Sequence, residues 1–185
     1  MSEKTSTSEK TSTRDKLIRA ILVVIGITIV WLLVSPTGAK RAPNLTVTSI
    51  QGKKINLQSP ARPVLVVFWA TTCATCIQEI PYLKKLYSKL GSAGFEIIGV
   101  AMSYDRPDLV VNMAKRLQIN YPVVVDFQGK VFKAFKLKRQ VTPTSILIAP
   151  GNRIVMHTIG KMNMHKLEKT VSNMLNLNQQ AKQNL

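Results

Sequence analysis

Phe68-Trp69-Ala70-Thr71-Thr72-Cys73-Ala74-Thr75-Cys76 is the segment from which the architecture of this chain is best predicted. It joins a continuous apolar run, Val64–Trp69, to a segment from Ala74 to Leu90 in which apolar residues recur at helical spacing. An uninterrupted apolar run of this length is typical of a strand that is buried on both faces. The sequence therefore predicts a buried strand that leads into a long helix, with two cysteines at the junction.

Cys73 and Cys76 are the only cysteines of the 185-residue chain. One pair supplies neither the framework of a disulfide-rich domain nor the four ligands of a structural zinc site. At a helix start, Cys73 would face unpaired N–H groups that favour the thiolate, the species that attacks disulfides. Cys76, one turn further along the same face, would act as the resolving thiol. From spacing alone, an inert bridge at the helix start remains the alternative, and no metal or cofactor is expected.

The rest of the chain alternates between strand and helix patterns. The expected elements are a hairpin over 45–57, a strand over 95–101, a helix over 106–117, a strand over 121–126, a helix from Val131, a hairpin of strands 145–149 and 153–159, and a helix over 164–177. Such alternation predicts an α/β domain with a central sheet between helices.

These patterns resemble the thioredoxin superfamily and, within it, the membrane-anchored TlpA/ResA-like thiol-disulfide oxidoreductases. The resemblance covers residues 45–177 and implies a thioredoxin-like fold, in which helices flank a central mixed sheet that follows an N-terminal hairpin. Four features carry it: Phe68-Trp69-Ala70 before the cysteines, Pro81 five residues after Cys76, Tyr121–Asp126 with Gly129-Lys130, and Val141-Thr142-Pro143-Thr144, which matches the family's cis-proline segment. Together these motifs are specific.

The resemblance also assigns roles to residues around the cysteines. Pro143 would be cis and face the disulfide, and the backbone of Thr142 would pair with an incoming chain by strand addition. Trp69 and Thr72, which precede the cysteines, would contact the substrate. The alternatives are an ordinary proline at a strand entry for Pro143 and core packing for Trp69.

Glu79 stands three residues after Cys76, at the spacing Cys-x-x-Glu-x-Pro of the ResA-like members. The strand position where thioredoxin itself keeps an acidic residue holds Val67 here. A buried carboxyl group below the sulfurs would have a raised pKa and would shuttle the proton of Cys76. An exposed helix glutamate that pairs with a lysine is the alternative.

The function predicted from these residues is a protein disulfide reductase that exchanges a dithiol with partner proteins outside the cytosol, with cytochrome c maturation as one setting. No histidine lies between the cysteines to make a strong oxidant, which favours the reducing direction. Thr72 replaces the family's usual tryptophan, so the site should be more open. The alternatives are a disulfide-donating oxidase or isomerase and, in a different class, a copper(I)-handling thiol protein.

The N-terminal region reads as an appendage to this domain. Residues 1–16 are predicted to be a disordered polar tail, 17–35 a transmembrane anchor or signal segment, 36–44 a linker, and 178–185 a frayed end. With the oxidoreductase function, an anchor predicts a single-pass protein of the bacterial inner (cytoplasmic) membrane. Its domain would face the periplasm and take electrons from an upstream membrane donor.

The formal net charge is +17, and from Lys40 onward there are 21 basic and six acidic residues. A field of this sign favours anionic lipid surfaces or acidic proteins as partners. No nucleic-acid-binding motif accompanies the charge, so no nucleic-acid partner is expected. A solvated basic surface without a dedicated partner is the simplest interpretation.

Overall fold

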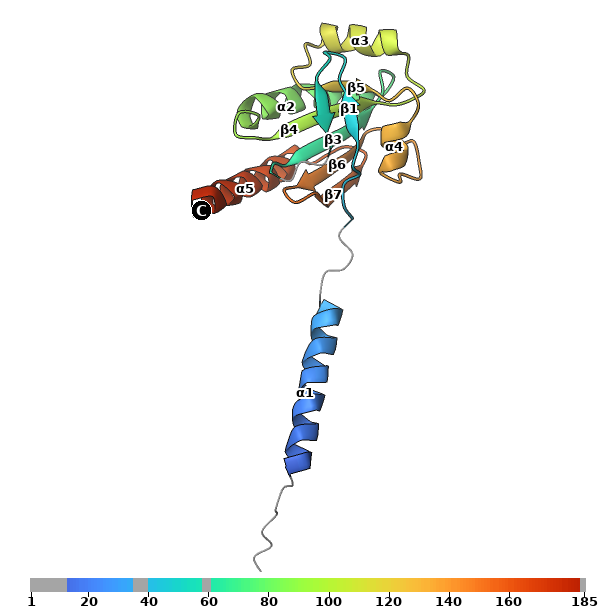
Figure 1. Cartoon of the computed structure of the whole chain (residues 1–185). Helices are drawn as coiled ribbons and strands as arrows, with labels where there is room; N and C mark the ends of the chain where they lie inside the picture. The colour runs from blue at the N-terminus through green and yellow to red at the C-terminus, as the bar shows by residue number, and fades with distance from the viewer. Residues whose placement is uncertain (1–12, 35–39, 58–60, 184–185) are drawn as a thin grey trace, which may run out of the picture. The chain divides into compact units, whose positions relative to one another are not determined.

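The computed structural model describes residues 13–34, 40–57 and 61–183 of a chain that divides into two units, Met1–Gly38 and Ala39–Leu185 (Figure 1). The first unit contains one helix, α1 (Thr13–Val34), whose side chains from Lys16 to Val30 are all exposed. Within these described ranges, no helix has both the length and the apolar character that crossing a membrane requires. The anchor or signal segment predicted at 17–35 stays a prediction.

The second unit is built on a five-stranded mixed sheet in the order β5-β4-β3-β6-β7. The central strand β3 pairs parallel with β4 and antiparallel with β6, while β5 and β7 occupy the two edges. A separate antiparallel hairpin, β1-β2, precedes the sheet as predicted. The strands are β1 (Thr46–Thr48), β2 (Lys54–Asn56), β3 (Val64–Trp69), β4 (Glu96–Ala101), β5 (Val123–Val125), β6 (Thr144–Ala149) and β7 (Arg153–Ile159).

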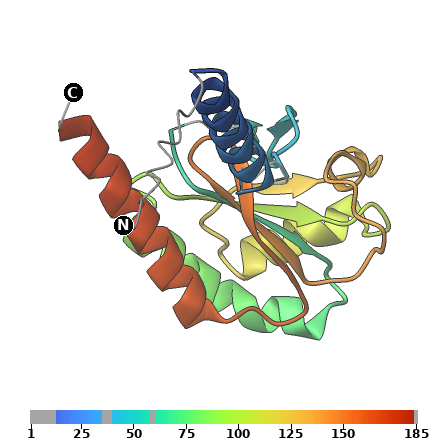
Figure 2. The same cartoon turned by 90° about the horizontal axis from the view of Figure 1, so that it is seen from below.

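Three helices cover one face of the sheet, and the hairpin with a short helix covers the other. Successive side chains of a strand point to opposite faces, so Leu65, Val67 and Trp69 pack into one core cluster with residues of α2 (Ala74–Leu90), α3 (Pro107–Arg116) and α5 (Met164–Gln183). Val64, Val66 and Phe68 pack into the other, with the hairpin and α4 (Lys130–Ala134). Helices α2 and α5 lie side by side (Figure 2). This arrangement confirms the predicted thioredoxin-like sheet.

Three predicted boundaries are wrong. Helix α1 begins at Thr13, inside the predicted tail, while residues 1–12 lie outside the described ranges. Helix α5 continues to Gln183, through the predicted frayed end, because residues 178–183 include glutamine, alanine and lysine, which favour helices. The final two residues also lie outside the described ranges.

The third wrong boundary is the C-terminal half of the predicted linker, which is part of the fold. The N–H of Ala42 donates to the carbonyl of Asn152, and the N–H of Ile154 donates to the carbonyl of Lys40, both at 2.8 Å. An edge strand such as β7 offers unpaired backbone groups, and this segment satisfies some of them. Ala42 is buried as a result.

Candidate active site

The two cysteines form a disulfide at the start of α2. Cys73 is the N-cap residue of the helix, and its N–H donates to the carbonyl of Ala70 across the turn that follows β3. The N–H of Cys76 points back at Cys73 and donates to its Sγ at 3.2 Å. An N–H group and a helix N-terminus at one sulfur both favour negative charge there. The geometry therefore suits Cys73 as a thiolate once the bond is reduced.

Burial makes the two sulfurs unequal. Cys76 is 2 % exposed and belongs to the core cluster beneath α2. Cys73 is half-buried and packs only at the margin of that cluster, and Thr72 before it is exposed. An incoming disulfide can reach Cys73, whereas Cys76 is shielded from the surface. This difference agrees with the predicted division into an attacking and a resolving cysteine.

The cis-proline segment and the cysteines lie at the same end of the two central strands, β3 and β6. The Thr142–Pro143 peptide bond is cis, as the resemblance implied. Strand β6 pairs antiparallel with β3, with Thr144 opposite Phe68, so the residues just before β6 continue alongside the end of β3. Pro143 is buried, and its carbonyl accepts a hydrogen bond from the N–H of Gly160 at 2.8 Å. Thr142, the residue expected to meet a partner, is half-buried.

Trp69 was expected to contact substrate, but its side chain is 4 % exposed and lies in the core. Its indole Nε1 lies 3.3 Å from the place that a Cβ on Gly99 would occupy. Because Gly99 has no side chain, the indole ring can lie close against this part of β4. This position favours the alternative, in which Trp69 packs under the site.

Glu79 is buried on α2, one turn after Cys76. Its Oε1 accepts a hydrogen bond of 2.6 Å from the N–H of Met162, while Oε2 is buried without a partner. Burial raises the pKa of this carboxyl group, and the Met162 N–H and the charge of Lys161 oppose the rise in part. The alternative of an exposed glutamate paired with a lysine is wrong. The role of Glu79 in proton transfer stays a prediction.

Two residues near the site were missed by the sequence analysis. Asp105 is buried and accepts two hydrogen bonds of 2.6 Å, one from the N–H and one from the Oγ1 of Thr71. This carboxyl group ties the turn before the cysteines to the segment that leads into α3. The second is Tyr121, whose pKa is raised by its burial and by the nearby charge of Glu79.

In the sequence, Asp105 lies between a buried strand and a helix that begins with a proline. This pattern suggests a helix cap and does not indicate the contact with Thr71. Within the described ranges, no group of three or more His, Cys, Asp or Glu side chains is placed to hold a metal ion.

Comparison with known proteins connects this site to a family. Residues 37–177 match the Redoxin family. The thiol-disulfide oxidoreductase ResA of Bacillus thuringiensis subsp. konkukian (strain 97-27) is 35 % identical over 132 residues, which are 70 % of this chain and 74 % of that protein. The ResA protein of Bacillus subtilis (strain 168) is 33 % identical over 122 residues, 65 % of this chain and 66 % of that protein.

The solved structure of StoA from Bacillus subtilis is similar in fold, with a TM-score of 0.61 and 23 % identity. The match covers 71 % of this chain and 98 % of StoA.

The cysteine pair lies at the start of α2, beside a thioredoxin-like sheet, in a geometry that suits thiol-disulfide exchange. Together these features define a thiol-disulfide oxidoreductase. With its match to the family over residues 37–177 and its similarity to the curated relatives, the chain belongs to the Redoxin family and, within it, to the ResA thiol-disulfide oxidoreductases.

Proposed function

We propose that this oxidoreductase works as a protein disulfide reductase outside the cytosol, with Cys73 as the attacking thiol and Cys76 as the resolving thiol. The observation that carries the proposal is the contact at the helix start, where the N–H of Cys76 donates to Sγ of Cys73 at 3.2 Å. This N–H stabilises negative charge on Sγ of Cys73, the more accessible of the two sulfurs, whereas Cys76 itself is buried. The pair is thus built to attack through one sulfur and close through the other.

The exchange follows from these two positions. The Cys73 thiolate attacks one sulfur of a partner's disulfide, so a mixed disulfide forms and the partner's other sulfur leaves as a thiolate. The Cys76 thiolate then attacks Cys73, which restores the Cys73–Cys76 bond and releases the second partner thiolate. Two electrons pass to the partner, and protons from solvent complete its thiols. An upstream dithiol, for which we propose a membrane electron donor, reduces the Cys73–Cys76 bond again.

The backbone before β6 is the proposed contact for the partner chain. Among the described residues, neither the N–H nor the carbonyl of Thr142 has a hydrogen-bond partner. Free main-chain groups beside a reactive site can bind an extended peptide by strand addition. Thr72, exposed on the other side of Cys73, would border the same peptide. The proposed substrates are cysteine-containing polypeptides, and cytochrome c maturation, with apocytochrome thiols, is the setting that the family resemblance implies.

We further propose that residues 17–35 direct the domain out of the cytosol, either as an anchor in the bacterial inner membrane or as a signal segment. The support is the run from Ala20 to Val34, which contains no charged residue. Cell fractionation with N-terminal sequencing tests this. A full-length protein in the membrane fraction supports the anchor, and a shortened periplasmic protein supports the signal segment. A full-length protein in the cytosol would contradict both.

Trapping of partners tests the reductase cycle itself. In Cys76→Ala the resolving thiol is absent, so the mixed disulfide with Cys73 should accumulate and survive non-reducing electrophoresis. Cys73→Ala is the matched control and should trap nothing, because its remaining thiol is buried. Adducts that form equally well on both variants would contradict the assigned roles.

A further inference from the structure

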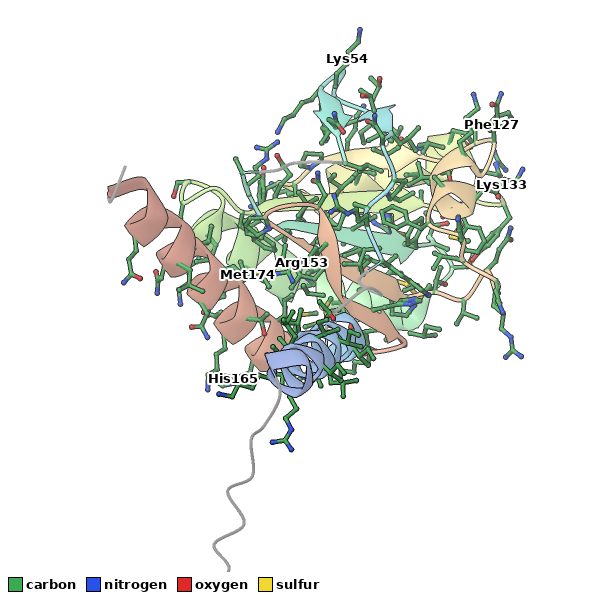
Figure 3. The ribbon with its side chains drawn as sticks, turned by 60° about the horizontal axis from the view of Figure 1, so that its bottom comes forward. Lys54, Phe127, Lys133, Arg153, His165 and Met174 are labelled. Carbon is green, nitrogen blue, oxygen red and sulfur yellow. A yellow bond between two sulfur atoms is a disulfide. The ribbon has the colours of Figure 1, made fainter. Side chains whose placement is uncertain are left out.

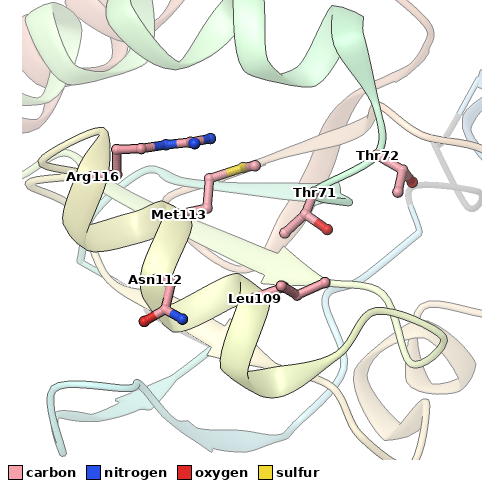
Figure 4. A pocket seen from close by; sticks show the side chains of 6 residues that line it. All are labelled: Thr71, Thr72, Leu109, Asn112, Met113 and Arg116. Atoms are coloured by element: carbon pink, nitrogen blue, oxygen red, sulfur yellow. The ribbon is translucent and has the colours of Figure 1, made fainter.

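A pocket of about 370 Å³ lies directly beside the redox pair, and the proposed exchange does not use it (Figure 4). Thr71 and Thr72, the two residues before Cys73, form one wall. The other wall is the face of α3. Its lining residues are Leu109, Asn112, Met113 and Arg116.

The α3 wall combines an apolar surface with one positive charge. Leu109, Met113 and Arg116 are four and three residues apart, so they share one face of the helix. Figure 4 shows the side chains of Met113 and Arg116 extending from α3 over the space beside Thr71. Leu109 is 43 % exposed, so its apolar side chain is open to a ligand in the pocket.

The charge of Arg116 is not neutralised within the protein. Among the described residues, Arg116 forms no ion pair within 4.0 Å, whereas Arg106 at the start of α3 is paired with Asp108 at 2.8 Å. The neighbouring residue Lys115 adds a second positive charge. The last turn of α3 contains no acidic residue that could offset these two charges. A ligand that fits this pocket therefore carries a negative charge next to an apolar group.

The pocket also has a fixed position relative to Cys73. Asp105, just before α3, holds the N–H and the Oγ1 of Thr71 at 2.6 Å each, so the two walls are joined by a buried carboxyl group. Thr72, which lines the pocket, directly precedes Cys73. A polypeptide whose disulfide meets Cys73 from the Thr72 side would therefore pass the pocket.

We propose that this pocket selects substrate polypeptides that carry an acidic side chain beside an apolar one near the reactive cysteine. The apolar side chain packs on Leu109 and Met113, and the carboxylate pairs with Arg116. This inference rests on the proposed function, because it names the class of polypeptide that the Cys73–Cys76 pair reduces. The overall positive charge of the chain, +17, acts in the same direction by attracting acidic partners.

Single-turnover reduction of two synthetic peptides tests the proposal with the full chain. Both peptides carry one cysteine as a mixed disulfide with mercaptoethanol and a leucine beside it. One has glutamates flanking these residues and the other has lysines. Each peptide rate is divided by the rate for bis(2-hydroxyethyl) disulfide with the same variant, so changes in the thiols themselves cancel.

The wild-type chain should reduce the glutamate peptide about two- to fivefold faster than the lysine peptide, as expected for one exposed ion pair, and salt should weaken this preference. Arg116→Gln should remove most of the preference, and Arg116→Glu should invert it. Lys115→Gln is the matched control, with the same charge change one residue away on α3 but outside the pocket lining, and should keep the preference.

Equal rates for the two peptides with the wild-type chain would overturn the proposal. An equal loss of preference in Lys115→Gln and Arg116→Gln would also overturn it, since general charge and not the pocket would then be responsible. Failure of the proposed function is distinguishable, because the chain would then not reduce bis(2-hydroxyethyl) disulfide either.

Discussion

At the scale of single residues, Cys73 and Cys76 share one disulfide bond but differ in how deeply they are buried. Spacing predicted that Cys73 and Cys76 form a pair at a helix start, because a helix start and a three-residue interval are local features. The flanking motifs were needed to favour a reacting pair over an inert bridge. The structure adds which sulfur is accessible and which is buried. Asp105 could not be predicted in its role, since its partner Thr71 is 34 residues away in sequence.

Glu79 is the residue whose chemistry depends most on burial. Burial raises the pKa of Glu79 above its ordinary value. Between the ordinary pKa and the raised one, the folded protein therefore holds a proton that the unfolded chain has released. Stability should therefore fall as the pH rises from the ordinary pKa of the carboxyl group to its raised value in the fold. In Glu79→Gln, which has no charge but can still accept from the Met162 N–H, this fall should be absent.

The measurement is denaturant unfolding of the oxidised protein from pH 4 to pH 8. Glu79→Gln should be about 1–3 kcal/mol more stable than the wild type above this pH window, the size of a buried unpaired polar group. Glu168→Gln, exposed and paired with Lys89, is the control and should not remove the fall. As the group predicted to shuttle the proton of Cys76, Glu79 should also shape the pH profile of thiol alkylation. An unchanged profile in Glu79→Gln would contradict that role.

At the scale of elements, the strand-turn-helix unit of β3 and α2 was predicted with its bounds because both patterns are strong. A continuous apolar run gives the buried strand, and helical spacing of apolar residues gives the helix. The extension of α5 to Gln183 and the pairing of Lys40–Ala42 with the start of β7 were not predicted, because neither segment has a periodic apolar pattern. Their structure depends on helix propensity and on an available strand edge.

The tie between Asp105 and Thr71 is the element-scale device that holds the turn before the cysteines against α3. In Asp105→Asn one of the two acceptor oxygens becomes an NH2 donor, so one acceptor for Thr71 is lost, and leaving a buried donor without an acceptor costs about 1–3 kcal/mol. We expect a loss of stability of this order and faster hydrogen exchange at the Thr71 amide. Asp108→Asn, on the exposed surface of α3, should change stability by less than about 0.5 kcal/mol. Equal losses in both variants would show that the tie has no special role.

At the scale of the whole molecule, the positive charge is distributed and not confined to one patch. Lys54 on β2, Lys133 on α4 and Arg153 on β7 are exposed on separate elements (Figure 3). A distributed field attracts acidic partners from a distance but does not orient them. Orientation at the redox pair must come from local contacts, for which the Thr142 backbone and the α3 pocket are the proposed sites.

The reduction potential of the Cys73–Cys76 pair is the most direct test of whether this oxidoreductase donates electrons to its partners. The full chain is equilibrated in glutathione or dithiothreitol redox buffers, and the fraction of the pair in the disulfide form is determined by thiol labelling. For a reductase we expect a potential of about −270 mV or lower, as in reducing thioredoxin-fold proteins. A potential of about −120 mV, that of a strong oxidant, would contradict it.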